Sequence, residues 1–279
     1  MSARLLTGKE PAEEILRSLV SKVASLKPLL VIVQVGDDPL SAKYIAKKIE
    51  KAESIGMKAE HLKLPASLSE AELIVEIERL NADEGVTGYI IQLPLPEELW
   101  EASSNIFSMI DPAKDVDGFT SQNMGNVFLS AESEHLPPAT PAGVIALLDY
   151  YEIDVAGKNV VIIGRSNLVG KPLAAMLTNR SATVTLCHSK TDDLAVHTEQ
   201  ADIVISAVGK AGLVTGKMLH PGAIVIDIGM THDDGAILGD IDFESASAVA
   251  SAITPVPGGV GPLTVACLLR NVVRAARAL

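Results

Sequence analysis

The chain has 279 residues, of which 48% are hydrophobic and 3% aromatic, so it can bury two cores built from aliphatic side chains. Its formal net charge of −12 at pH 7 opposes a general affinity for nucleic acid or an anionic membrane. No apolar run reaches the roughly 18 residues that a membrane span needs, and the amino terminus lacks the apolar core of a signal peptide. Composition therefore predicts a soluble protein without nucleic-acid or membrane partners.

The first half of the chain alternates strand and helix signals. Continuous apolar runs such as 29–35 are typical of strands that are covered on both faces. The expected elements are strand 29–35, helix 40–55, strand 57–64, helix 69–81, strand 86–93 and helix 97–109. This order predicts βαβ units and therefore an α/β fold with a parallel sheet.

Between residues 119 and 140 the pattern loosens into polar residues and ends in the proline-rich stretch 137–141, where we place a domain boundary. Further on we expect helix 141–152 and strands over 160–163, 182–187, 202–206, 223–228 and 251–254. The segment from Pro262 to Leu279 has helical spacing and is expected to pack back on the first domain. The predicted domains are residues 1–139 with this helix, and residues 140–261.

The stretch 160–172 is the most informative part of the second domain, since a buried strand passes through a glycine turn into a helix. In open parallel sheets this is where a dinucleotide binds. Gly164 and Gly170 fit the glycine fingerprint, but Ser166 stands where its second glycine is usual. By itself the turn suits either a dinucleotide site or an ordinary connection between strand and helix.

The end of the next strand favours NADP over NAD. NAD enzymes usually carry an acidic residue there that binds the ribose hydroxyls, whereas this chain has His188-Ser189-Lys190. Arg165, Ser189 and Lys190 instead suit a 2′-phosphate, because a guanidinium offers a planar fork of donors and an ammonium a point charge.

Polar residues at strand ends of the first domain are candidates for chemistry. Tyr44 and Lys48 lie four residues apart on one helix face, a spacing that also fits packing plus a solvated charge. Gln92 ends an apolar strand just before Pro94, so it is either satisfied within the fold or directed at a ligand.

A metal site is not predicted. Asp115 and Asp117 are two residues apart, but without further oxygen ligands the pair favours a turn. The histidines lie singly, and Cys187 and Cys267 are expected to be buried thiols in a reducing cytoplasm. The loop 254–262 is poor in side chains, so it either lets the backbone approach a ligand or is only a tight connection.

Six blocks together resemble the bifunctional methylenetetrahydrofolate dehydrogenase/cyclohydrolase family, in the family's order and over nearly the whole chain. They are Tyr44-Ile45-Ala46-Lys47-Lys48 with Gly56, Gln92-Leu93-Pro94-Leu95-Pro96, Lys114-Asp115-Val116-Asp117-Gly118, Gly164-Arg165-Ser166, His188-Ser189-Lys190-Thr191 and Pro257-Gly258-Gly259-Val260-Gly261-Pro262. The resemblance implies a folate-binding domain, a Rossmann-like NADP-binding domain, an active-site cleft between them and a homodimer.

The implied reactions are NADP-dependent oxidation of 5,10-methylenetetrahydrofolate to the methenyl cation and hydrolysis of that cation to 10-formyltetrahydrofolate, as in purine biosynthesis. By resemblance, Lys48 activates water or relays protons in the hydrolytic step, and Gln92 helps set its orientation and protonation. Tyr44 stacks on the folate and hydrogen-bonds in the Lys48 network, and Asp117 accepts hydrogen bonds from the pterin. Depression of the lysine pKa beside a cationic substrate would help it act as a base.

The resemblance also assigns binding residues. The substrate contacts are Tyr44, Lys48, Ile91, Gln92, Leu93, Asp117, Pro257, Gly258, Gly259, Val260 and Gly261, and the cofactor contacts are Gly164, Arg165, Ser166, Ser189 and Met230. The chain departs from the commoner pattern at Ala139, at Leu263 and over residues 49–51, none of which removes a proposed catalytic group. The alternatives are a dehydrogenase without hydrolase activity, using NADP or NAD, and a non-catalytic NADP-binding protein on the same fold.

Overall fold

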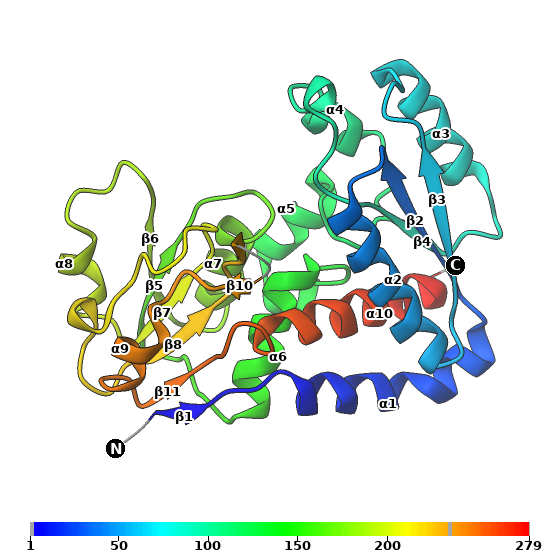
Figure 1. Cartoon of the computed structure of the whole chain (residues 1–279). Coiled ribbons are helices and arrows are strands. Elements are labelled where there is room, and N and C mark those ends of the chain that lie inside the picture. The colour runs from blue at the N-terminus through cyan, green and yellow to red at the C-terminus, as the bar shows by residue number, and fades with distance from the viewer. Residues whose placement is uncertain (1–2, 234–235, 279) are drawn as a thin grey trace. The chain divides into compact units, whose positions relative to one another are not determined.

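The computed structural model describes residues 3–233 and 236–278, and the chain forms two units that each contain a parallel sheet (Figure 1). Unit 1 consists of Met1–Glu13, Val127–Ser133 and Thr140–Thr264. Unit 2 consists of Glu14–Asn126, Glu134–Ala139 and Val265–Leu279. The α/β class predicted from the sequence is confirmed.

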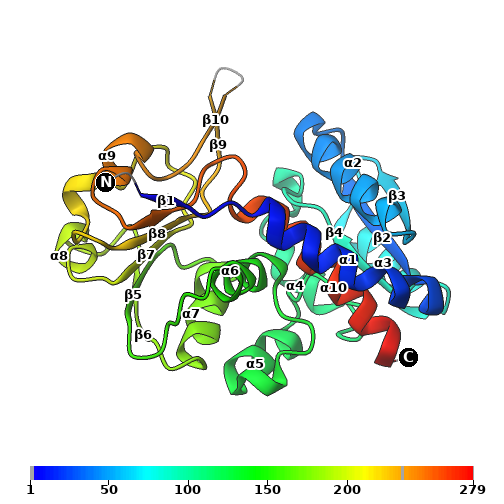
Figure 2. The same cartoon turned by 90° about the horizontal axis from the view of Figure 1, so that it is seen from below.

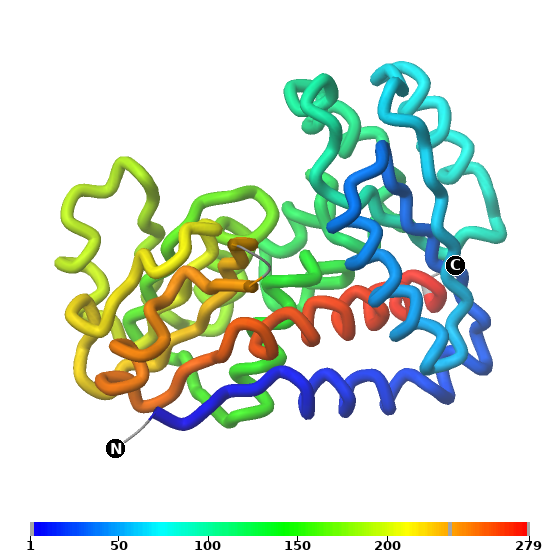
Figure 3. Tube along the Cα trace, in the orientation of Figure 1, coloured from blue at the N-terminus to red at the C-terminus, as the bar shows by residue number. Residues whose placement is uncertain are grey.

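Unit 2 is built on a three-stranded sheet in the order β3 (Lys58–Leu64), β2 (Leu29–Val35) and β4 (Gly88–Ile91). Both pairs are parallel, with Leu30 opposite Ala59 on one side and Gly88 on the other. From β2 the chain passes to β3 on one side and then to β4 on the other, a path that Figure 3 shows in blue and cyan. The carboxyl ends of β2 and β4 therefore flank a switch in strand order, where ligands bind in sheets of this kind.

The helices of unit 2 bury apolar stripes on this sheet. Its elements are α2 (Pro39–Ser54), α3 (Glu70–Ala82), α4 (Ser103–Ser108), the 3₁₀ turn η1 (Glu97–Leu99) and parts of α1 (Lys9–Leu26), α5 (Ser121–Leu129) and α10 (Val260–Ala278). Ser69 starts α3 through a capping box with Glu72. Leu73, Ile77 and Leu80, at helical spacing, then join the core cluster that contains the β2 valines.

Unit 1 contains six parallel strands. Their order is β1 (Arg4–Leu5), β11 (Ala252–Ile253), β8 (Ile224–Asp227), β7 (Ile203–Ser206), β5 (Asn159–Ile163) and β6 (Thr183–Cys187). The chain runs from β5 to β6 at one edge and then back to β7 on the other side of β5. This reversal is the dinucleotide switch point of a Rossmann-like sheet.

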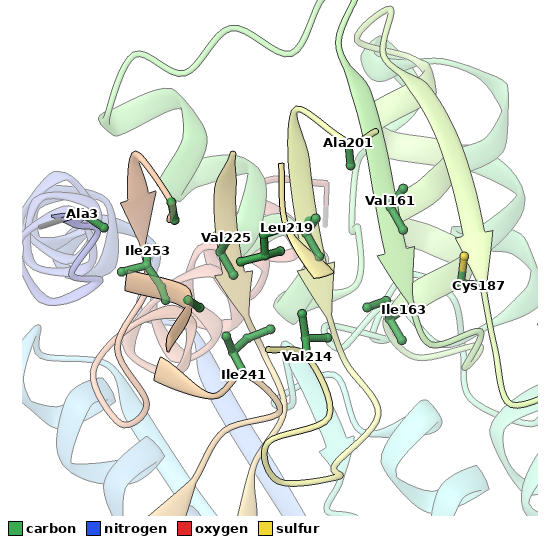
Figure 4. Packing of buried hydrophobic residues seen from close by; sticks show 13 residues of the cluster. Ala3, Val161, Ile163, Cys187, Ala201, Val214, Leu219, Val225, Ile241 and Ile253 are labelled. Atoms are coloured by element: carbon green, nitrogen blue, oxygen red, sulfur yellow. The ribbon is translucent and has the colours of Figure 1, made fainter. Parts of the chain in front are cut away.

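The core of unit 1 explains its uninterrupted apolar strands. Val161 and Ile163 of β5 point into one cluster with Cys187 and Val225 (Figure 4). Val160 and Ile162 point to the opposite face and are buried as well, so the strand is covered on both sides. The helices are α6 (Ala139–Tyr150), α7 (Gly170–Thr178), α8 (Leu194–Thr198) and α9 (Phe243–Ser247), with 3₁₀ turns η2 (Ala131–Ser133) and η3 (Gly216–Met218). A short antiparallel pair, β9 (Thr231–Asp233) and β10 (Ala236–Leu238), is visible in Figure 2.

Three expectations from the sequence are wrong. The predicted helix 97–109 is instead the turn η1 followed by the short α4. The backbone between them bonds over three residues, from the Trp100 N–H to the Glu97 carbonyl and from the Ser103 N–H to the Trp100 carbonyl, which also accepts from the Ser103 hydroxyl. The predicted irregular stretch 119–140 contains α5. The strand expected over 86–93 has only four residues in β4 and ends before Gln92. Leu279, the last residue of the predicted C-terminal helix, lies outside the described residues.

Candidate active site

Lys48 and Gln92 meet in unit 2. Asp38 caps α2 by accepting a hydrogen bond from the Ser41 backbone N–H at 2.6 Å, and Lys48 lies in the third turn of that helix. Gln92 follows β4, and its Oε1 accepts a 2.9 Å hydrogen bond from Nζ of Lys48. Its Nε2 donates to the Leu93 carbonyl at 2.7 Å. Since the amide NH₂ is held by Leu93, the amide oxygen is directed at the lysine.

Burial and charge perturb both ionisable groups of this site. Burial lowers the pKa of Lys48, and the nearby Asp117 carboxylate partly opposes that effect. The pKa of Asp117 is raised to about 6, mainly by burial. The charge of Lys48 lowers this pKa, and the charge of Asp115 raises it. The structure thus brings together Lys48, Gln92 and Asp117, which the sequence places in separate segments. A lysine with a lowered pKa can act as a base closer to neutral pH.

Asp115 shapes the loop that carries Asp117. It is buried, and its carboxylate accepts hydrogen bonds of 2.8 to 3.1 Å from the backbone N–H groups of Gly118, Phe119 and Thr120 and from the Asn123 side chain. The predicted turn is therefore held together by one carboxylate that accepts hydrogen bonds from several backbone N–H groups. Sequence reasoning missed this role, because an aspartate two residues from another aspartate gives no sign of which one faces inward.

The other folate contacts expected in unit 2 lie close to this pair in the chain. Tyr44 is half-buried one turn before Lys48, and burial raises the pKa of its phenol. Ile91 is buried in β4 and Leu93 is half-buried directly after it. Tyr44 also makes an interaction within the structure. Its position is compatible with packing and with ligand contact alike.

The expected cofactor loop of unit 1 requires glycine at two positions. A Cβ on Gly164 would lie 2.5 Å from the Ala207 carbonyl oxygen, and one on Gly170 would lie 1.8 Å from the Gly164 carbonyl oxygen. Ser166, in place of the second fingerprint glycine, accepts a 3.1 Å hydrogen bond from the Val169 backbone N–H at the start of α7. The glycine turn is confirmed as a close backbone crossing at the carboxyl end of β5.

The predicted 2′-phosphate residues are on the surface of unit 1. Arg165 and Ser189 are exposed at the carboxyl ends of β5 and β6, which are neighbours in the sheet. The loop after β6 is held by a 2.9 Å bond from the His188 backbone N–H to the Thr191 hydroxyl. Arg165 and Ser189 therefore follow the carboxyl ends of neighbouring parallel strands, the edge at which ligands bind in sheets of this kind.

Two buried aspartates organise the same edge. Asp227, at the end of β8, accepts from the backbone N–H groups of Asp240 and Ile241 at 3.0 and 2.9 Å. Asp240 in turn accepts from the Ser206 hydroxyl and from the backbone N–H groups of Val208 and Lys210, at 2.8, 2.8 and 2.7 Å. Burial raises the pKa of Asp227 to about 6. Sequence reasoning missed both residues, since each reads as an ordinary residue at a strand end or turn.

The remaining predicted contacts also belong to unit 1. Met230 follows β8 and is 44% exposed, which leaves its side chain accessible to a ligand. The segment Pro257–Gly261 leads into α10, and the Gly259 backbone N–H donates to the Pro255 carbonyl at 2.8 Å. The Gly258 carbonyl accepts from the Gly8 N–H at 2.8 Å. The loop is thus fixed by backbone contacts and presents little side chain.

Within the described residues, 3–233 and 236–278, no helix is long and apolar enough to cross a bilayer. No group of three or more His, Cys, Asp or Glu side chains in that part of the chain could hold a metal ion. Cys187 and Cys267 are buried free thiols, as the sequence predicts. The fold and the site define a dinucleotide-binding α/β protein with a lysine-centred site in its second unit.

Comparison with known proteins places the chain within this class. The family model for the catalytic domain of tetrahydrofolate dehydrogenase/cyclohydrolase matches residues 6–117, and the model for the NAD(P)-binding domain of that family matches residues 138–279. The chain belongs to the tetrahydrofolate dehydrogenase/cyclohydrolase family, which confirms the resemblance drawn from its motifs.

Named relatives agree over nearly full length. The bifunctional protein FolD 2 of Lactobacillus johnsonii is 48% identical over 275 residues, which cover 97% of this chain and 96% of that protein. The structure of the FolD methylenetetrahydrofolate dehydrogenase/cyclohydrolase from Campylobacter jejuni is similar with a TM-score of 0.95, 43% identity and 99% coverage of both chains. The FolD structure from Trypanosoma brucei, complexed with NADP cofactor and inhibitor, has a TM-score of 0.94 and 34% identity, and covers 100% of this chain and 98% of that one.

Proposed function

We propose that this chain oxidises 5,10-methylenetetrahydrofolate with NADP and hydrolyses the resulting 5,10-methenyltetrahydrofolate to 10-formyltetrahydrofolate. The observation that carries the proposal is the hydrogen bond from Lys48 to Gln92, together with the lowered pKa of that lysine. Family membership supports the two activities, and the relatives named bifunctional support their presence in one chain.

The residues of unit 1 fit a dinucleotide phosphate. Gly164 and Gly170 permit the close backbone crossing at the end of β5, and Arg165, Ser166 and Ser189 are exposed at the ends of β5 and β6. These residues, with Met230, would hold NADP, and the arginine would distinguish its 2′-phosphate from the hydroxyl of NAD. Bound NADP supplies the acceptor for the hydride of the methylene carbon.

The folate would be held and hydrolysed by residues of unit 2. The Asp117 carboxylate offers only acceptors when ionised, which matches the amino and ring N–H donors of the pterin. Tyr44 would stack on the folate. Lys48 in its neutral form would take a proton from the water that adds to the methenyl carbon, while Gln92 keeps Nζ in place by accepting one of its hydrogens. Ring opening then gives the formyl product.

The proposal also covers the domain organisation, the oligomeric state and the cellular compartment of the protein. Residues 1–139 with the helix 262–279 would form the folate domain, except for residues 1–13 and 127–133, which belong to unit 1. Residues 140–261 would form the NADP domain, with Pro257–Gly261 supplying backbone to the folate, and the protein would act as a cytoplasmic homodimer. The buried free thiols support a reducing compartment. Because 10-formyltetrahydrofolate is an activated one-carbon donor, its use would include purine biosynthesis.

A single substitution tests the hydrolytic half of the proposal. Lys48→Gln should reduce methenyl hydrolysis to the uncatalysed rate, since a neutral amide cannot take the proton, and should leave NADP binding intact. Lys51→Gln is the matched control, because Lys51 is exposed on the same helix. Hydrolysis at the wild-type rate in the Lys48 variant would refute this role. A protein that reduces NADP but never hydrolyses the methenyl compound would be a dehydrogenase alone.

A further inference from the structure

Asn271 is a fully buried amide on α10 to which the proposed reaction assigns no role. Its Nδ2 donates to two backbone carbonyls, that of Val116 at 3.0 Å and that of Pro137 at 2.8 Å. Among the described residues, its Oδ1 is buried without a hydrogen-bond partner. An unpaired buried oxygen costs stability, so packing by itself would favour an apolar residue at this position. The two donors of the amide are therefore what this position requires.

The two carbonyls that Asn271 holds belong to segments that pack closely against each other. Val116 directly precedes Asp117 in the chain, and Gly118 directly follows it. A Cβ on Gly118 would lie only 2.6 Å from the backbone nitrogen of Pro138, so the two backbones touch at this point. Asn271 therefore ties the loop that carries Asp117 to the neighbouring segment, one residue before the aspartate.

The position of the Asp117 carboxylate depends on the backbone around it. Among the described residues, no donor forms a hydrogen bond with this carboxylate, and it interacts with Lys48 and Asp115 through charge. Its oxygens are therefore available to a ligand. The backbone that follows Asp117 is fixed by the Asp115 carboxylate, which accepts hydrogen bonds from the N–H groups of residues 118–120. On the preceding side, Asn271 holds the carbonyl next to Asp117.

We propose that Asn271 is a positioning residue for folate binding, an inference that rests on the proposed function. By holding the Val116 carbonyl, it sets the place at which the Asp117 carboxylate meets the amino and ring N–H donors of the pterin. Hydrogen bonds weaken steeply away from linear geometry, so a shifted carboxylate would bind these donors less well. Asn271 and Asp117 both belong to unit 2, whereas the proposed cofactor residues belong to unit 1. The effect should therefore be confined to the folate.

Asn271→Leu tests this role, because it removes both donors and keeps a side chain of similar size. The Kd of tetrahydrofolate, measured by calorimetry, and KM for 5,10-methylenetetrahydrofolate should both rise roughly 5- to 20-fold. KM for NADP should stay within about twofold of the wild type. Asn271→Asp is the second variant, for use where the leucine variant does not fold. Its protonated carboxyl donates one hydrogen in place of two, so its effect should be smaller.

A double-mutant cycle with Asp117→Asn separates positioning from general support of the fold. If Asn271 acts through Asp117, its substitution should raise the Kd of tetrahydrofolate less than about twofold in the Asp117→Asn background, because the carboxylate that it positions is gone. Val272→Ala is the matched control, since Val272 is a fully buried neighbour on α10 whose side chain has no donor. This variant should unfold at a lower urea concentration than the wild type and keep the wild-type Kd.

Three results would overturn the inference: an unchanged Kd in the Asn271 variant, the same factor in both Asp117 backgrounds, or an equal loss of affinity in Val272→Ala. Failure of the proposed function is seen separately, as a wild type that binds tetrahydrofolate but does not oxidise 5,10-methylenetetrahydrofolate. In that case the cycle of dissociation constants still decides whether Asn271 positions Asp117. A wild type that binds no tetrahydrofolate would overturn both.

Discussion

Nζ of Lys48 donates to Oε1 of Gln92 at 2.9 Å, and the glutamine amide is held in that orientation by its own bond to the Leu93 carbonyl. A neutral partner at this distance accepts a hydrogen from the lysine without adding the negative charge that would stabilise the ammonium form. The lowered pKa that burial gives Lys48 is therefore preserved. The hydrolytic step as proposed then depends on the protonation state of this lysine.

Gln92→Glu should shift the pH dependence of hydrolysis. A carboxylate in place of the amide oxygen favours the ammonium form and raises the pKa of Lys48, so the rising limb of the profile of kcat against pH should move up by about one unit or more. Activity at pH 7 should fall accordingly. Gln92→Met is the neutral control, in which the limb should not move to higher pH. An unmoved limb in the glutamate variant would contradict the role of Lys48 as the base.

Asp117→Asn should stabilise the folded protein at neutral pH while weakening folate binding. The folded pKa of Asp117, about 6, lies above its ordinary value of 3.8. The carboxyl therefore destabilises the fold increasingly as the pH rises from about 4 to 6, and fully above that. The gain in unfolding free energy should be roughly 1–3 kcal/mol at pH 7.5 and close to zero at pH 3.5.

Urea unfolding of both proteins at the two pH values measures this gain, and folate titration measures the loss. The wild type should also bind folate more weakly below pH 6, where the carboxyl becomes protonated. A variant that is less stable than the wild type at pH 7.5, or that binds folate equally well, would contradict the description of Asp117.

Arg165→Ala should remove most of the preference for NADP. Loss of a hydrogen-bonded charge pair to the 2′-phosphate is expected to lower kcat/KM for NADP by roughly 10- to 100-fold and to change that for NAD little. Lys171→Ala is the matched control, because this nearby cation is engaged with Asn167 at 2.7 Å. Equal kcat/KM for the two cofactors in the wild type would refute the phosphate argument.

Asp240→Asn should impair cofactor binding without touching hydrolysis. The asparagine turns one acceptor into a donor that faces backbone N–H groups at Val208 or Lys210, so the loop after β7 loses its anchor. KM for NADP should rise about tenfold, which corresponds to one lost hydrogen bond to a charged group. Methenyl hydrolysis should stay within about twofold of the wild type.

Asp242→Asn controls for general damage to this segment. Asp242 caps α9 through a 3.1 Å bond from the Ser245 backbone N–H, and asparagine is an equally good cap. This variant should therefore keep the wild-type KM for NADP. Unfolding of the Asp240 variant, seen as lost hydrolysis in parallel with lost NADP binding, would show a structural role for Asp240 rather than a positioning one.

Sequence reasoning predicts those elements whose signal is local. The apolar run 29–35 is β2, and the glycine turn at Gly164 is a close backbone crossing, since in each case the residue types alone dictate the conformation. Helix α5 was missed because its start depends on Asp115, whose carboxylate gathers the N–H groups of residues 118–120 just before it. A side chain that accepts hydrogen bonds from the backbone in this way produces no periodic pattern of apolar residues in the sequence.

In the site, too, local features can be predicted from the sequence and long-range contacts cannot. The sequence identifies Lys48, Gln92 and Asp117 by their resemblance to family motifs, but not the contact between the first two, which depends on how β4 and α2 pack in unit 2. The sequence gives no sign of the role of Asp240, because its three donors come from the end of β7 and the loop after it, 30 to 34 residues away in the chain. Long-range partners of buried carboxylates follow only from the fold.

The most direct test of the proposed function is the absorbance of the purified protein with 5,10-methylenetetrahydrofolate and NADP, followed for NADPH and the methenyl compound together, with NAD in a parallel reaction. We expect NADP to be reduced in preference to NAD, and the methenyl compound to decay faster than in the enzyme-free control. Reduction without accelerated decay would contradict the hydrolytic role of Lys48. No reduction with either cofactor would contradict the proposed function as a whole.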